Sequence, residues 1–190
     1  MRQEKKVLAC VDKSDYATHV ADYAAWAAAR LSAPIELLHV IDRHPEIAAD
    51  VDRSGSIGVD AQENLLERLS QEEGERSKVI REQGRVFLNQ LRTRCETHTG
   101  LQTDTRQRYG QLLATLKEQE SSVGMYVLGR RGESASHTPR DLGRHVEAIC
   151  RQIRRPIMTV TDDFIAPKSV LVAYDAVSYT HLTLPTIYSV

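Results

Sequence analysis

Three glycines in the last third of the chain form the pattern with the clearest chemical meaning. Gly129 and Gly132 follow the apolar residues 125–128 directly, and Gly143 comes after ten intervening residues at the start of a helical segment. Glycines let backbone amides approach a phosphate closely, and a helix N-terminus adds partial positive charge. The pattern indicates an anion site. A tight turn followed by a solvated helix would use the same residues, so this alternative stays open.

Arginines reinforce the anion hypothesis. Residues 130–155 contain seven arginines, Arg130 and Arg144 among them, against three acids, although the whole chain carries 25 Lys and Arg against 26 Asp and Glu. A guanidinium group binds phosphate through a fork of donors. The near-neutral total argues against a protein that coats nucleic acid, and no nucleic-acid partner is expected.

The segments that must position these residues alternate between strand and helix patterns. Strands are predicted at residues 7–11, 35–41, 101–109, 125–128 and 157–160, the third being polar enough for a sheet edge. Helices are predicted at 16–31 with Ser14 or Asp15 as N-cap, at 59–95 with a bend or break at Gly74 or Gly84, after Gly110, and at 139–155. This alternation specifies a doubly wound α/β sheet, whose ligands gather at the carboxyl ends of the strands.

The element order and the spacing of Gly129, Gly132 and Gly143 resemble the universal stress protein family. Its signature is glycine, two residues, glycine, nine residues, glycine, then Ser or Thr. The resemblance covers residues 1–162 and implies an open five-stranded parallel sheet of the adenine nucleotide alpha hydrolase-like type, with strand order 3-2-1-4-5 and helices on both faces. Two departures are a ten-residue second gap and Arg144 at the hydroxyl position, for which Ser134, Ser136 or Thr138 could substitute.

The resemblance also implies a function. Asp12 matches the family's acid at the end of the first strand, facing ribose, and Val40 falls near its apolar adenine contact. The three glycines with Arg130 and Arg144 would hold the phosphates of ATP. We therefore expect a stress-response module that binds an adenine nucleotide with little or no turnover. The alternatives are a nucleotide-free dimerisation or scaffold protein, in which Arg144 fills the site, and a slow ATP hydrolase. Enzyme activity is left undecided, with binding alone favoured.

The end of the chain indicates a second, incomplete unit. Residues 166–175 repeat the basic lead-in, apolar strand and final Asp of residues 5–12, so 163–176 are expected to be a linker and the first strand of a truncated second copy. Residues 177–190 lack helical period and resemble a translated sequencing adaptor, a non-native tail. Tandem members of the family imply a homodimer, or pairing with the missing second domain.

Several classes of protein are disfavoured. No apolar run approaches a membrane span and no secretory signal is present, so a cytoplasmic protein without a membrane partner is expected. Cys10, Cys95 and Cys150 are far apart and are predicted to be buried free thiols. The histidine pairs 39/44 and 137/145 lack metal-binding spacing, so no metal site is predicted.

Overall fold

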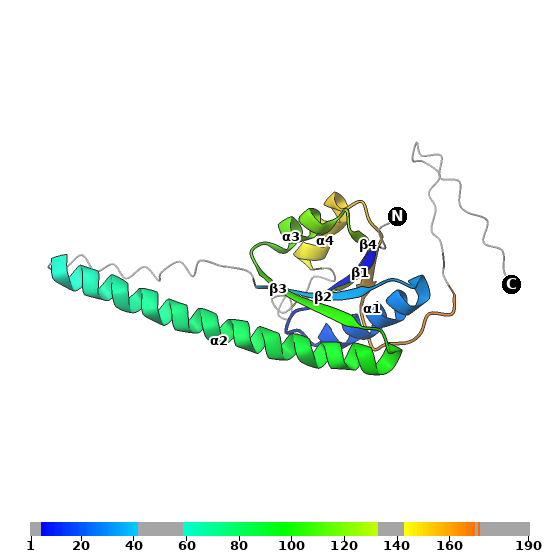
Figure 1. The fold of residues 1–190 in the computed structure, drawn as a ribbon. Helices are drawn as coiled ribbons and strands as arrows, with labels where there is room; N and C mark the ends of the chain where they lie inside the picture. Colours follow the sequence, from blue (N-terminus) through cyan, green and yellow to red (C-terminus); the bar gives the residue numbers. More distant parts are fainter. Residues whose placement is uncertain (1–4, 42–58, 133–142, 170, 172–190) are drawn as a thin grey trace.

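A computed structural model describes residues 5–41, 59–132, 143–169 and 171, with the backbone alone described for 59–70, 72, 73 and 144. Strands and helices alternate through these residues (Figure 1). In chain order they are β1 (Lys6–Cys10), α1 (Ala17–Leu31), β2 (Ile35–Ile41), α2 (Val59–Thr99), β3 (Thr103–Tyr109), α3 (Leu112–Gln119), β4 (Val123–Gly129), α4 (Arg144–Gln152) and β5 (Ile157–Val160). The five predicted strands are all found.

The strands form one parallel sheet in the order β3-β2-β1-β4-β5. Cys10, the last residue of β1, lies beside Leu38 of β2 on one side and Leu128 of β4 on the other. Strand order therefore reverses at β1 and β4, and β3 is an edge strand as its polar pattern predicted. The doubly wound sheet with order 3-2-1-4-5 is confirmed.

Side chains alternate between the two faces of the sheet and build one core on each. The first core joins odd-numbered residues of β1, such as Val7 and Ala9, to the alanine-rich side of α1 and to α2. The second joins Leu8 and Leu128 to α3 and α4 through Leu116 and Ile149. The apolar runs of β1 and β4 are continuous because helices cover both faces of each strand. Helices on both faces are thereby confirmed.

Two local predictions about the helices were wrong. Tyr16, rather than Ser14 or Asp15, is the N-cap of α1, and its side chain makes no capping bond. Ser14 is unavailable because both its backbone amide and its hydroxyl bond to the Asp12 carboxylate. The second is the predicted break in α2 at Gly74 or Gly84, because the helix continues without interruption for 41 residues.

The cysteines divide into three environments. Cys95 is buried, and burial raises the pKa of its thiol to about 12. Cys10 is partly buried, and desolvation raises the pKa of its thiol well above the usual range. Cys150 is exposed, so the prediction of a buried thiol was wrong there. Its neighbour Ile149 takes the inward position of α4 instead.

The segment of the chain after β5 packs against α1. The Phe164 ring packs edge-on against Tyr23 with centroids 4.9 Å apart, and the Ile165 amide donates to the Tyr23 hydroxyl at 3.3 Å. The predicted first strand of a second copy falls largely, and the predicted tail wholly, outside the described residues. Among the residues described, no helix combines the length and apolarity needed to cross a bilayer.

A buried carboxylate ties α1 to α2. Asp22 is 6% exposed and accepts two bonds from Arg94, at 2.7 Å from Nε and 2.8 Å from Nη2. His98, one turn further along α2, places Nδ1 3.4 Å from the same carboxylate. A bidentate guanidinium bond offsets much of the cost of burying this charge.

Replacing Arg94 should therefore destabilise the domain. We expect Arg94→Ala to lower the free energy of unfolding by about 1–2 kcal/mol. This is the usual contribution of a charge-assisted hydrogen bond, lowered because solvent partly screens the guanidinium group. Urea denaturation followed by circular dichroism measures it. Arg85→Ala is the matched control, because Arg85 pairs with Glu82 entirely at the surface, and it should leave the midpoint unchanged. Equal effects of the two variants would contradict the assigned role of Asp22.

Candidate functional site

The carboxyl ends of β1, β2 and β4 meet at one edge of the sheet, where strand order reverses. Asp12 lies two residues beyond the end of β1, and Gly129 is the last residue of β4. Because β1 and β4 are parallel neighbours, the chain leaves both strands at the same edge. Open α/β sheets bind their ligands at such a reversal point. The predicted Asp12 and glycine residues therefore share one region.

The loop after β4 is bonded to the elements on either side of it. The Arg130 amide donates to the Val160 carbonyl of β5 at 2.8 Å, and the Gly143 amide donates to the Arg130 carbonyl at 3.0 Å. Gly143 is also the N-cap of α4, with an extended backbone at φ −66° and ψ 140°. The start of α4 is thereby fixed against the end of β4, although residues 133–142 between them lie outside the description.

Two of the predicted glycines lie in tight contacts within the chain, where a side chain would press on its neighbours. A Cβ on Gly143 would lie 3.3 Å from the Arg130 carbonyl oxygen and 3.6 Å from the Arg131 Cα. A Cβ on Gly129 would lie 3.1 Å from the Arg131 carbonyl oxygen and 3.2 Å from the Tyr16 Cβ. Backbone atoms cannot move aside as a flexible side chain can. These glycines therefore have a packing reason that is independent of any ligand.

Gly132 instead adjoins a charged side chain. A Cβ at this position would lie 2.8 Å from Oδ2 of Asp12. The other carboxylate oxygen, Oδ1, accepts a bond of 3.1 Å from the Ser14 amide and a short bond from the Ser14 hydroxyl. Asp12 is thus held in one orientation, toward the glycine loop. Asp12 and Gly132 are 120 residues apart in the sequence, and the fold brings them together.

Val40 forms part of the apolar surface at the same edge. It lies near the carboxyl end of β2, two residues after Leu38, which pairs with Cys10. Its half-buried side chain packs against the core that α3 and α4 cover. Val40 can therefore offer an apolar contact close to the end of β1.

The remaining predicted residues are the two arginines. The backbone of Arg130 participates in both loop bonds described above, and its side chain is half-buried. Arg144 is the first residue of α4, so its backbone amide lies at a helix N-terminus. The position of its side chain, and the three hydroxyl residues between Gly132 and Gly143, lie outside the described residues.

His39 has a structural role that the sequence did not reveal. Its Nδ1 donates to the Val11 carbonyl oxygen over 2.9 Å, which joins β2 to the chain leaving β1. The ring is 7% exposed and lies edge-on to Phe87 of α2, with centroids 5.6 Å apart. Because His39 is buried and makes this bond, it positions the end of β2 relative to the chain that leaves β1. Among the residues described, no cluster of three or more His, Cys, Asp or Glu could hold a metal ion.

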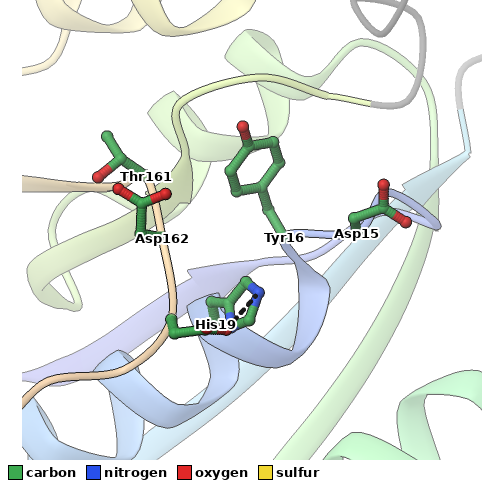
Figure 2. A pocket seen from close by; sticks show the side chains of 6 residues that line it. Asp15, Tyr16, His19, Thr161 and Asp162 are labelled. Atoms are coloured by element: carbon green, nitrogen blue, oxygen red, sulfur yellow. Dashed lines mark ion pairs between the residues drawn. The ribbon is translucent and has the colours of Figure 1, made fainter.

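A small hollow of about 250 Å³ lies beside this edge, between the start of α1 and the segment after β5. Figure 2 shows its lining: His19 in the first turn of α1 and Asp15 and Tyr16 just before the helix, with Thr161 and Asp162 on the other side. His19 Nε2 is 3.4 Å from Oδ1 of Asp163, the pair marked by the dashed line. Its acidic lining disfavours phosphate, so it is not the predicted anion site.

Comparisons with known proteins agree with the fold. The family model of universal stress proteins matches residues 4–161. A curated relative, the universal stress protein Slr1230 of Synechocystis, is 31% identical over 172 residues, which cover 90% of this chain and 60% of Slr1230. The chain thus spans about three fifths of the length of that relative.

Two solved structures are similar in fold. A universal stress protein in complex with cAMP superposes with a TM-score of 0.53 at 16% identity, covering 84% of this chain and 98% of the other. The universal stress protein from Archaeoglobus fulgidus in complex with dAMP gives a TM-score of 0.50 at 13% identity, covering 83% and 98%. At these identities the likeness establishes the fold alone.

The tight packing of Gly143 leads to a stability prediction. Gly143→Ala should lower the free energy of unfolding by about 1–2 kcal/mol, because the methyl group would press on the Arg130 carbonyl and alanine is a poor N-cap. Gly74→Ala is the control, since a Cβ there meets nothing within 4 Å; it should stabilise the helix by up to about 1 kcal/mol. Thermal unfolding of both variants provides the measurement. A neutral or stabilising Gly143→Ala would show that the loop is not held as described.

Proposed function

Because the chain belongs to the universal stress protein family, we propose that it binds an adenine nucleotide, ATP, at the carboxyl edge of its sheet. The observation that carries the proposal is the contact between Asp12 and the position of Gly132. It brings a fixed carboxylate at the end of β1 next to a glycine loop that leads to a helix N-terminus. Ribose and phosphate need these two environments side by side.

Each part of the nucleotide has a matching group. A carboxylate accepts hydrogen bonds and repels phosphate, so Asp12 is assigned to ribose hydroxyls. Val40 is assigned to the adenine ring. The phosphates are assigned to the backbone around Gly129, Gly132 and Gly143, to the α4 N-terminus and to the side chains of Arg130 and Arg144. The cAMP and dAMP complexes of the two similar proteins support an adenine nucleotide as the ligand class.

Binding with little or no turnover is part of this proposal. ATP hydrolysis needs a group that orients or deprotonates the attacking water. His39, at the end of β2, is buried and bonded to the Val11 carbonyl, so it is not presented to water. We accordingly propose a cytoplasmic binding module that works as a homodimer or pairs with a second domain. Release of phosphate from ATP by the purified chain would instead favour a slow hydrolase.

The first test blocks the glycine loop. Gly132→Val places a side chain against the Asp12 carboxylate, so it should abolish ATP binding measured by isothermal titration calorimetry. The parent protein should show a heat of binding, and ATP at one hundred times Kd should stabilise it by about 2.7 kcal/mol. Gly74→Val is the matched control, because that position is open and distant in sequence from the edge; it should bind ATP like the parent. Circular dichroism confirms that each variant is folded.

Arg144 separates the binding function from the scaffold alternative. If its guanidinium group clamps phosphate, Arg144→Ser should weaken ATP binding or, at best, preserve it through the family's usual hydroxyl. If Arg144 fills an empty site, the same substitution should create binding that the parent lacks. Absence of any heat in the parent, Gly132→Val and Arg144→Ser would reject the nucleotide proposal and leave a nucleotide-free scaffold of the same fold.

A further inference from the structure

The two oxygens of the Asp12 carboxylate have different surroundings. Both donors of Ser14 reach the same oxygen: the amide donates to Oδ1 at 3.1 Å, and the hydroxyl donates to Oδ1 in a short bond. The other oxygen, Oδ2, is turned to the glycine loop and lies 2.8 Å from the position of a Cβ on Gly132. One oxygen is therefore bonded to the chain next to Asp12, and the other is turned to the loop after β4.

The bonds from Ser14 use the full accepting capacity of Oδ1. A carboxylate oxygen has about two lone-pair positions, and the amide and the hydroxyl of Ser14 occupy that number. A third donor at Oδ1 would have to displace one of these bonds. Both Asp12 and Ser14 are half-buried, so solvent reaches the carboxylate. A hydroxyl group of a ligand therefore meets this carboxylate through Oδ2.

The main chain before Asp12 is fixed as well. The Val11 amide donates to the Leu38 carbonyl over 2.9 Å, and the Val11 carbonyl accepts from Nδ1 of His39 over 2.9 Å. Both bonds lead to β2, so the backbone enters Asp12 from a fixed peptide group. Because Ser14 holds the carboxylate from the other side, the side chain cannot turn Oδ1 outward without breaking bonds. The orientation of Oδ2 is thus set before any ligand arrives.

We propose that Ser14 limits Asp12 to one oxygen for the ligand, so that the site reads one ribose hydroxyl, the 3′-hydroxyl. This inference rests on the proposed function, which assigns Asp12 to ribose and the backbone around Gly132 to phosphate. In a nucleotide the phosphates are attached at C5′, and C3′ is one carbon nearer to C5′ than C2′ is. Oδ2 is the oxygen beside the phosphate loop. The hydroxyl that meets it is therefore the 3′-hydroxyl.

Ser14 is a positioning residue in this account, because it acts on the ligand through Asp12. A bond from the amide of Ser14 to the carboxylate two residues earlier also stabilises a turn. Loss of the turn would weaken the binding of every nucleotide to the same extent. The proposed role instead changes the ratio between the affinities of different nucleotides, since it decides which carboxylate oxygen meets the ribose.

Deoxynucleotides test the inference on the unaltered chain, through the Kd values of ATP, 2′-deoxy-ATP and 3′-deoxy-ATP in isothermal titration calorimetry. We expect 2′-deoxy-ATP to bind within about threefold of ATP and 3′-deoxy-ATP to bind about tenfold more weakly or worse, the usual contribution of a hydrogen bond to a charged acceptor. Losses that are equal, absent, or larger for 2′-deoxy-ATP overturn the inference while the proposed function stands. A chain that binds no ATP rejects the proposed function and the inference with it, so the two failures are distinguishable.

Ser14→Ala tests the serine hydroxyl directly. The variant keeps the amide bond but releases one accepting position on Oδ1, so the carboxylate can also engage the 2′-hydroxyl. The preference for 2′-deoxy-ATP over 3′-deoxy-ATP should fall by about threefold or more, whereas Ser14→Thr, which retains a hydroxyl, should keep it. Ser122→Ala is the matched control, because it removes a hydroxyl that donates to the Gln119 carbonyl over 2.9 Å just before β4, at the opposite edge of the sheet. An equal loss of all three affinities in Ser14→Ala, with the preference intact, overturns the inference.

Asp12→Asn tests the other member of the pair and leaves Ser14 in place. The two donors of Ser14 should turn the side-chain oxygen of the new amide toward themselves, which places its NH2 group, a donor, where Oδ2 was. The charge-assisted bond to the 3′-hydroxyl is then lost, and the preference of ATP over 3′-deoxy-ATP should fall to about threefold or less. Circular dichroism confirms that each variant is folded. A preference that stays as large in Asp12→Asn as in the parent overturns the inference.

Discussion

The parallel pairing of β1 with β4 is the constraint on which the candidate site depends. Cys10 beside Leu128 sets the register, and the chain leaves both strands at the same edge. Asp12 and Gly132 come from segments more than one hundred residues apart, yet this pairing brings them into contact. A shift of one residue would exchange the faces of β1 and move Leu8 out of the core that α3 and α4 cover. Core packing therefore protects the site geometry.

Most of the fold was readable from the sequence because buried parallel strands leave continuous apolar runs. The segments at β2 and β5 were located to the residue, and the polar alternation of β3 correctly placed it at an edge. The order of the strands in the sheet could not be read from the apolar runs. It came from the family resemblance, since apolar runs say which segments are strands but not which of them are neighbours.

The candidate site was only partly predictable, and the missing parts share a physical cause. Asp12, Gly129 and Gly132 lie at or after the ends of strands and, with Gly143 at a helix start, match the family's pattern; Val40 was assigned from the same resemblance. The bond from Ser14 to Asp12, the bond from His39 to Val11 and the Asp22–Arg94 pair were missed. Each depends on where side chains meet after folding. Ser14 shows this best: a residue type suited to capping a helix was instead bonded to a neighbouring carboxylate.

The glycines have two explanations, and the structure separates them. Gly129 and Gly143 lie in tight contacts with backbone atoms of the loop and, for Gly129, with Tyr16, so packing favours glycine at both positions even without a nucleotide. Gly132 adjoins only the Asp12 carboxylate among the contacts found. It is therefore the glycine whose absence of a side chain bears most directly on ligand access.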